Sequence, residues 1–208
     1  GPALLQQAQD IYQMVRSTDD LPLAQINLAL TESLAMQLTA PLLKSLGKRA
    51  ERWRFCSGLN QDYHQSFLAR NIDLLVTGSS VMGSSENLVI HPVLKEYYIL
   101  AFPSSYQGSV ELENIGDSLN LVRFSRSAAM SQQIERQISR MQLRFPNRLE
   151  VESTHQQLNT VATGLGWTIT SPICLAGHRD LWPKLRLDPM QKGKFSRQIQ
   201  VIARRDEL

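Results

Sequence analysis

The chain has 208 residues, of which 42% are hydrophobic and 20% are charged, and its formal net charge is +3. These values are typical of a soluble globular protein and leave room for two small lobes. The charge is too weak, and the basic residues are too widely spread, to indicate nucleic-acid binding, and no apolar run approaches the roughly 20 residues that cross a bilayer.

The first twenty residues are predicted to form a connector helix. Gly1-Pro2 resembles the remnant of a protease cleavage site, and a helix is predicted over 3–16, followed by a turn-forming segment at 17–20. The apolar positions of this helix repeat with the 4-3-4 spacing of a coiled-coil seam: Leu4, Ala8, Ile11 and Val15. Because the segment is polar and rich in Gln, we expect no secretory signal in it. We interpret it as a dimerisation or connector segment.

The next part of the chain alternates strands with helices. Apolar runs predict strands over 25–30, 52–56 and 72–77. Helices are predicted between them, over 33–46 and 60–70. Nearly continuous apolar strands joined by helices indicate a parallel sheet that is covered on both faces.

A second alternating block follows two extended segments at 88–93 and 97–102. Its predicted elements are a strand over 119–124, a helix over 128–143, a strand over 149–152, a helix over 154–163 and a strand over 167–170. Extended runs at 185–187 and 195–203 close the chain. The pattern predicts two α/β lobes with a cleft between them, and in such sheets ligands bind at the carboxyl ends of the strands.

The sequence offers little for catalysis. It contains no nucleophile elbow, P-loop, His-Glu-x-x-His or Cys-x-x-Cys motif, and its four histidines lack metal-ligand spacing. Gly164-Leu165-Gly166 follows a helix, which is the wrong context for gripping a pyrophosphate. Cys56 and Cys174 lie far apart in apolar surroundings, which favours reduced thiols and a cytoplasmic protein. We therefore expect no enzyme activity, no metal and no cofactor.

Hydroxyl-bearing residues recur where a predicted strand ends and a helix begins. The positions at these turns are Thr31, Glu32, Ser33, Thr77, Gly78, Ser125, Ser153 and Thr154. Free N–H groups and the positive end of a helix dipole make such turns favourable for carboxylates and other anions. Ser and Thr are also ordinary helix caps, so capping alone is the alternative at each single turn.

Several short sequence segments, in this order along the chain, resemble segments of one protein family. They are INLALTESLA at 26–35 with PLL at 41–43, LARNIDLLV at 68–76, HPVL at 91–94, VRFSRS at 122–127 and GLGWTITSPICL at 164–175. Together they resemble the effector-binding region of LysR-type transcriptional regulators, from about residue 23 to residue 204, and the preceding helix resembles the end of the family's linker helix.

The resemblance implies a fold like that of the type 2 periplasmic solute-binding proteins. Lobe one would comprise 21–101 plus 178–208 and lobe two 102–177, with two crossing strands near 101–103 and 177–178 as the hinge. A small carboxylate or amino-acid-like metabolite would bind in the interlobe cleft and change the oligomer geometry. The family's N-terminal helix-turn-helix, which has no match here, would then read promoter DNA. The expected partners are the effector and further copies of the chain, as a dimer of this domain and a tetramer of the full-length protein, without a membrane. The alternative is a stand-alone solute-binding protein that serves a transporter.

The resemblance also implies effector contacts. They are Thr31, Glu32 and Ser33 after the first strand, Thr77 and Gly78 after the third, Phe102 and Pro103 at the hinge, and Arg123, Ser125, Ser153 and Thr154 in lobe two. Glu32 would favour a cationic or amine-bearing effector if it points into the cleft, and is otherwise a favourable first-turn acid. Arg123 would pair with an effector carboxylate or form a structural salt bridge.

Overall fold

The computed structural model describes residues 22–58, 60–79, 87–115, 119–126, 128–145, 148–190 and 195–205. The connector helix predicted over 3–16 lies outside these residues. The described residues divide into two compact units: unit 1 comprises those up to Lys95 and from Gln198 onward, and unit 2 spans Glu96–Arg197. Within the described residues, no helix is long and apolar enough to cross a membrane.

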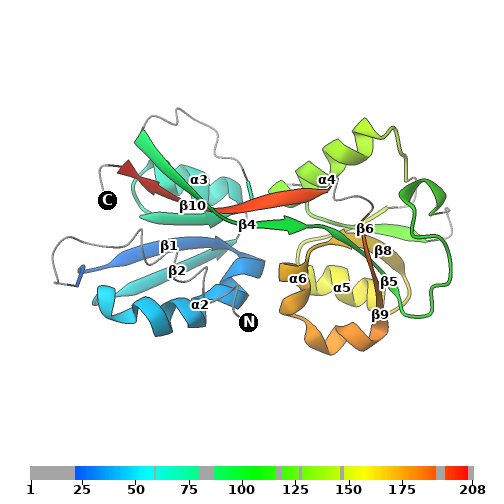
Figure 1. The fold of residues 1–208 in the computed structure, drawn as a ribbon, viewed down its shortest axis with the longest axis horizontal. Helices are drawn as coiled ribbons and strands as arrows, with labels where there is room; N and C mark the ends of the chain where they lie inside the picture. Colours follow the sequence, from blue (N-terminus) through cyan, green and yellow to red (C-terminus); the bar gives the residue numbers. More distant parts are fainter. Residues whose placement is uncertain are drawn as a thin grey trace. The chain divides into compact units, whose positions relative to one another are not determined.

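Unit 1 contains one mixed five-stranded sheet with the order β2-β1-β3-β10-β4 (Figure 1). Its elements are β1 (Ile26–Thr31), α2 (Glu32–Leu46), a 3₁₀ turn at Gly47–Arg49, β2 (Trp53–Gly58), α3 (Asn60–Leu68), β3 (Leu74–Thr77), β4 (Leu88–Tyr97) and β10 (Ser196–Arg204). β1 is parallel to both β2 and β3, whereas β10 runs antiparallel to β3. The predicted parallel βαβαβ core is therefore present, and β10 adds an antiparallel strand beside β3.

The apolar pattern explains why these elements form. In α2 the buried leucines repeat every four residues and make one continuous stripe: Leu34, Leu38, Leu42 and Leu46. On the sheet, β3 is buried at every position. Phe67 of α3 packs with Leu75 and Ile202 in one core cluster. Strands covered in this way need apolar residues on both faces, which is why they appear as unbroken hydrophobic runs.

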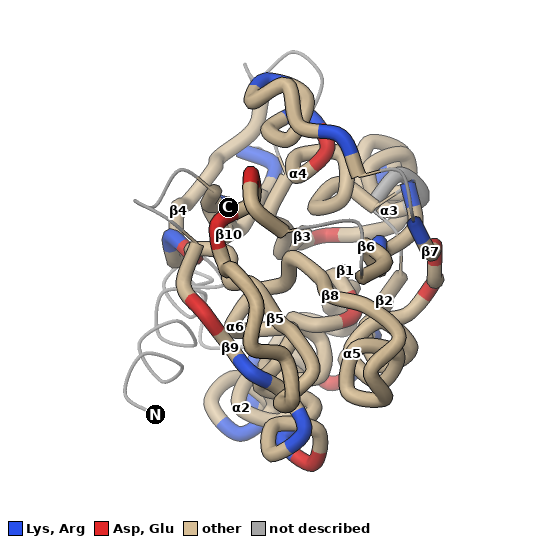
Figure 2. The backbone as a smooth tube through the Cα atoms, turned by 90° about the vertical axis from the view of Figure 1, so that its right-hand side faces the viewer, with Lys and Arg blue, Asp and Glu red and all other residues tan. Residues whose placement is uncertain are grey.

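Unit 2 contains a second mixed five-stranded sheet, with the order β7-β6-β8-β5-β9. Its elements are β5 (Ile99–Pro103), a 3₁₀ turn at Leu112–Asn114, β6 (Asn120–Phe124), α4 (Ala129–Arg140), β7 (Arg148–Val151), α5 (Thr154–Ala162), β8 (Gly166–Thr170), α6 (Pro172–Ala176), a 3₁₀ helix at Arg179–Lys184 and β9 (Leu185–Pro189). β6 is parallel to β7 and β8, whereas β5 is antiparallel to β8 and β9. Basic and acidic positions are interspersed along the described backbone (Figure 2).

Two hydrophobic clusters stabilise unit 2. One is aromatic: Trp167 stacks on Phe102 with ring centroids 5.9 Å apart and meets Phe145 edge-on at 5.1 Å. The other joins α5 to the sheet through Leu158, Val161 and Val122. Aromatic pairs at these separations add to the stability that comes from burial alone.

The unit boundaries differ from those expected. The sequence placed 96–101 and 178–197 in lobe one, but the structure places both segments in unit 2. The reason is strand pairing, because β9 runs antiparallel to β5 over its whole length, from Ile99↔Pro189 to Pro103↔Leu185. The chain accordingly passes between the units at Lys95–Glu96 and at Arg197–Gln198, and not near residues 101–103 and 177–178.

Candidate functional site

In unit 1, the predicted contacts after the first and third strands lie at the ends of neighbouring strands. β1 and β3 are parallel, and their register pairs Leu30 with Val76. Thr31 and Thr77 are the next residues along the two strands, so both hydroxyl residues end at the same edge of the sheet. The sheet therefore brings together two turns that are 46 residues apart in the sequence.

The hydroxyl of Thr31 has an unusual environment. Thr31 is the N-cap of α2 with extended backbone angles, but its side chain makes no capping hydrogen bond. Its Oγ1 atom is buried and has no hydrogen-bond partner among the described residues. An N-cap threonine ordinarily accepts a bond from a first-turn N–H, and a buried polar atom without a partner costs about 1–3 kcal/mol. Capping therefore does not account for this hydroxyl.

The neighbouring turn after β3 is held by hydrogen bonds. The backbone N–H of Ser79 donates to Oγ1 of Thr77 at 3.1 Å, and the side chain of Gln200 donates to the carbonyl oxygen of Ser79 at 2.9 Å. Thr77 and Gly78 are buried. Ser33, in the first turn of α2, is also buried, at 8% exposed, while Glu32 beside it is exposed. The edge formed by β1 and β3 therefore gathers small polar groups in a largely buried setting.

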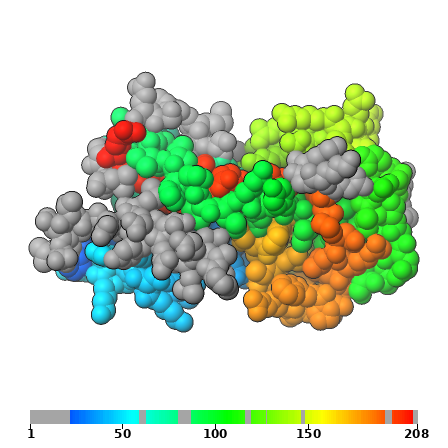
Figure 3. Space-filling model, viewed as in Figure 1, coloured from blue at the N-terminus to red at the C-terminus, as the bar shows by residue number. Residues whose placement is uncertain are grey.

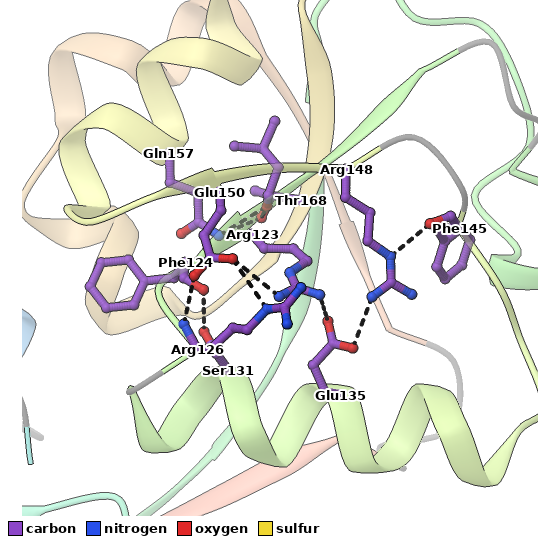
Figure 4. A network of polar contacts seen from close by, with 11 residues as sticks. Arg123, Phe124, Arg126, Ser131, Glu135, Phe145, Arg148, Glu150, Gln157 and Thr168 are labelled. Atoms are coloured by element: carbon purple, nitrogen blue, oxygen red, sulfur yellow. Dashed lines mark hydrogen bonds and ion pairs between the residues drawn. The ribbon is translucent and has the colours of Figure 1, made fainter. Parts of the chain in front are cut away.

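Arg123 of unit 2 lies at the centre of an ion-pair network (Figure 4). Its guanidinium lies 3.0 Å from Glu135 of α4 and 3.5 Å from Glu150 of β7, and its side chain is 8% exposed. The network continues through Arg148, 3.2 Å from Glu135, and Arg126, 3.3 Å from Glu150. Arg123 therefore forms structural salt bridges, which was one of its two predicted roles. Its other predicted role, pairing with an effector carboxylate, stays a prediction.

The other predicted contacts of unit 2 have different environments. Ser153 is the N-cap of α5 and accepts a hydrogen bond from the N–H of Gln156 at 3.1 Å, so its hydroxyl has the ordinary capping role. Thr154 is buried and Ser125 is half-buried.

Phe102 and Pro103 lie in the interior of unit 2. Phe102 is 0% exposed and stacks on Tyr106 with ring centroids 4.5 Å apart, and Pro103 is also buried. The structure thus gives Phe102 a core-packing role, and contact with an effector stays a prediction for both residues.

Sequence reasoning did not single out the polar groups after β8. Thr170 ends that strand, and its Oγ1 atom is buried without a hydrogen-bond partner among the described residues. Ser171 caps α6, accepting from the N–H of Cys174 at 3.3 Å, and Pro172 follows it. Ser before Pro is a recognisable helix-start signal, so this turn was accessible from the sequence.

The sequence also did not predict the buried ion pair between Glu96 and Arg197. The carboxylate accepts from Nε of Arg197 and from the N–H of Ile173, at 2.6 and 2.7 Å. Burial acts to lower the pKa of Arg197, but Cys174, Glu96 and Tyr98 raise it, and the net shift is upward. Arg197 is therefore charged throughout the accessible pH range. No local sequence signal marks two residues so far apart as partners.

The described residues contain no cluster of three or more His, Cys, Asp or Glu side chains that could hold a metal ion. Cys56 and Cys174 are both free thiols, half-buried and buried respectively. The rings of His155 and His178 lie 5.3 Å apart between centroids.

Comparison with known families identifies the kind of domain. A family model described as the LysR substrate binding domain matches residues 20–208. No curated protein matches the sequence.

Solved structures resemble the fold at low sequence identity. The effector-binding domain of QuiR in complex with shikimate is 15% identical, with 88% of each chain covered and a TM-score of 0.73. Full-length OxyR from Pseudomonas aeruginosa, in a variant form, is 13% identical, with 98% of this chain and 67% of that chain covered and a TM-score of 0.73. The regulatory domain of CcmR from Synechocystis PCC6803 in complex with 2-PG is 13% identical, with 86% and 87% covered and a TM-score of 0.74. At these identities the likeness establishes the fold alone.

Proposed function

Because the chain belongs to the LysR substrate binding domain family, we propose that it is the part of a regulator that senses a small carboxylate or amino-acid-like metabolite. Two of the similar structures hold small molecules, shikimate in QuiR and 2-PG in CcmR, which supports a small-molecule effector here. The proposed primary contacts are Thr31, Ser33 and Thr77 at the ends of β1 and β3.

The observation that carries this proposal is the unpartnered hydroxyl of Thr31. It is buried at the N-terminus of a 15-residue helix, where N–H groups are free and the helix dipole is positive. A carboxylate oxygen at this position would accept a hydrogen bond from the hydroxyl and a further one from the helix. Binding would recover the stability that the orphaned hydroxyl costs, so the site is built to favour an oxyanion.

The remaining predicted contacts extend the proposal. Gly78 and Ser125 directly follow β3 and β6, and Thr154 begins α5 after β7; turns of this kind after parallel strands are where ligands bind in such sheets. Glu32, exposed beside Ser33, would add affinity for an effector that carries an amine as well as a carboxylate. Arg123 and Ser153 already bond other groups of unit 2, so we rank them, with Phe102 and Pro103, below the contacts of unit 1.

In the full-length regulator we propose that effector binding acts on DNA through the oligomer. The domain would pair as a dimer within a tetramer, and an N-terminal helix-turn-helix would contact promoter DNA in the cytoplasm. This part rests on family membership. The chain would carry no catalytic activity, because the similar domains act in regulation and the polar groups described are suited to binding.

The test is a thermal-shift screen of the protein against amino acids, aromatic acids and other small carboxylates. A ligand at a hundred times its Kd stabilises the folded state by about 2.7 kcal/mol. We expect a hit whose affinity falls at least about tenfold in Thr31→Val and in the double variant Ser33→Ala/Thr77→Ala, because each removes donors to the anion.

The control is Thr39→Val, because Thr39 lies on the same helix and its hydroxyl donates to the carbonyl oxygen of Ala35 at 2.8 Å. This variant should bind the hit with unchanged affinity. Without ligand, Thr31→Val should raise Tm by about 2–4 °C, because the orphaned hydroxyl is gone. A hit that binds both site variants as tightly as the unaltered protein overturns the assignment of the site.

A further inference from the structure

A cavity of about 240 Å³ lies in unit 2, and its lining includes none of the proposed effector contacts. It is lined by α4 residues at spacings of three and four, by the residues just before β5 and β10, and by the first residue of β10: Gln133, Arg136, Gln137, Arg140, Tyr98, Phe195 and Ser196. Residues at such spacings share one face of a helix. At about 30 Å³ for each water molecule in the liquid, the cavity has room for a small organic molecule.

The walls of this cavity carry positive charge. Arg136 and Arg140 are one helical turn apart and exposed, and no carboxylate is among the lining residues. Neither arginine forms an ion pair with a carboxylate among the described residues. Glu135, their acidic neighbour on α4, is held by Arg123 and Arg148 at 3.0 and 3.2 Å. The two guanidinium groups are therefore not neutralised by the helix that carries them.

The remaining lining groups add hydrogen-bond donors and an aromatic surface. The hydroxyl of Tyr98 donates to Oε1 of Gln133 at 2.9 Å, which orients that amide. Burial raises the pKa of Tyr98, so the phenol stays protonated and contributes no negative charge. The side chains of Tyr98 and Phe195 are 2% and 3% exposed and form an apolar base. The cavity thus combines two cations, two amides and an aromatic floor.

We propose that this cavity binds a small organic anion, through a carboxylate or phosphate group on Arg136 and Arg140. The planar guanidinium fork matches the oxygen pairs of both groups. The site shares no residue with the edge formed by β1 and β3, so it is a second ligand site on the same domain. Figure 3 shows α4, in yellow-green, at the surface of unit 2, and Arg136 and Arg140 are both exposed to solvent.

The test measures binding of inorganic phosphate and of succinate by isothermal titration calorimetry, at constant ionic strength. Direct binding is required, because phosphate also raises protein stability by exclusion from the surface. We expect saturable binding of at least one probe at a single site. In the double variant Arg136→Gln/Arg140→Gln, affinity should fall about tenfold or more. The probe that binds more tightly identifies the head group.

The matched control is Arg144→Gln/Arg179→Gln, which removes the same charge from two exposed arginines outside the cavity. It should keep the affinity of the unaltered protein. Equal losses of affinity in both double variants would mean that net charge alone attracts the anion. If neither probe bound, the proposed site would also be overturned. Ser33→Ala/Thr77→Ala should leave probe binding unchanged, which separates failure of this site from failure of the proposed effector site.

One further outcome concerns the surface of α4. Suppose that Arg136→Gln/Arg140→Gln converts a dimer to a monomer in sedimentation velocity while anion affinity is unchanged. The two arginines would then contact another copy of the chain. That result overturns the proposal.

Discussion

The Nε atom of Arg197 lies 2.6 Å from Oε2 of Glu96, and the two side chains are 5% and 3% exposed. The residues lie on β10 and β4, at the two positions where the chain passes between the units. Glu96 also accepts from the N–H of Ile173, and Arg197 donates to Oγ of Ser171 at 3.2 Å. Both charges are thus paired and hydrogen-bonded, which joins the two crossing strands to the start of α6.

Removing the charge of Glu96 should strongly destabilise the protein. Glu96→Gln keeps the side-chain volume but leaves the guanidinium of Arg197 buried without a counter-charge, at a cost of about 3–5 kcal/mol. The free energy of unfolding in urea measures the loss. The control is Asp188→Asn, because Asp188 pairs with Arg186 at 3.0 Å in a more exposed setting, 24% and 34% exposed. It should cost at most about 1 kcal/mol. Equal losses in the two variants would contradict the buried-pair account.

Tyr98 should make the protein less stable in alkaline solution. Burial raises the pKa of Tyr98 above its ordinary value of 10.0, Glu96 adds to the rise, and Arg197 opposes it. Above about pH 10 the unfolded chain loses this proton while the folded chain keeps it. The unfolded state then binds fewer protons, so stability falls as the pH rises, by about 1.4 kcal/mol per pH unit. Below pH 10 the contribution is fully present.

The matched variant for this pH effect is Tyr98→Phe, which keeps the ring and removes the titrating group. Urea unfolding between pH 8 and pH 11 should show a steeper loss of stability in the unaltered protein than in the variant. Parallel curves for the two proteins would mean that Tyr98 does not carry the effect.

The elements of this fold that could be predicted are those with a local signal. The alternating pattern of strands and helices predicted a helix over 33–46, and the structure has Glu32–Leu46. The unbroken apolar run of β3 predicted a strand buried on both faces, as observed. The unit boundaries could not be predicted in this way, because they depend on β9 pairing with β5, two short strands whose partners lie more than 80 residues apart in the sequence.

The same distinction applies to the candidate site. That Thr31 and Thr77 share an edge follows from the parallel pairing of β1 with β3, and the alternating pattern of strands and helices predicts a parallel sheet. The partners of Arg123 do not follow from the sequence, because Glu135 and Glu150 come from a helix and a strand that only the folded sheet brings together. Glu96 and Arg197, 101 residues apart, are the extreme case.

Arg204 should stabilise unit 1 through the two hydrogen bonds of its planar guanidinium group. Its Nη1 and Nη2 atoms donate to the carbonyl oxygens of Phe67 and Ile72 at 2.6 and 2.8 Å, and its guanidinium lies 4.7 Å from the centroid of the Phe67 ring. Arg204→Lys keeps the charge but not the two-pronged geometry, and should cost about 1.5–3 kcal/mol. Urea unfolding measures this loss. Arg205→Lys, at the exposed neighbouring position, should change stability by less than about 0.5 kcal/mol; a similar cost at both positions would refute the role of the fork.

Gly166 should not tolerate a side chain. It opens β8 opposite Asn120 of β6, and a Cβ atom there would press against the carbonyl oxygen of Asn120 and lie 2.7 Å from Cγ2 of Val122. The obstructing oxygen belongs to the backbone of a paired strand and cannot rotate away, so Gly166→Ala should destabilise the protein by about 1–3 kcal/mol. The control is Gly47→Ala, because Gly47 has helical angles of φ −52° and ψ −33° and nothing within 4 Å of an added Cβ. That variant should gain about 0.4–1 kcal/mol by restricting the unfolded chain. Thermal unfolding of the two variants should therefore give Tm changes of opposite sign, and a fall in Tm of the same size for both would show that the contact with Asn120 is not the cause.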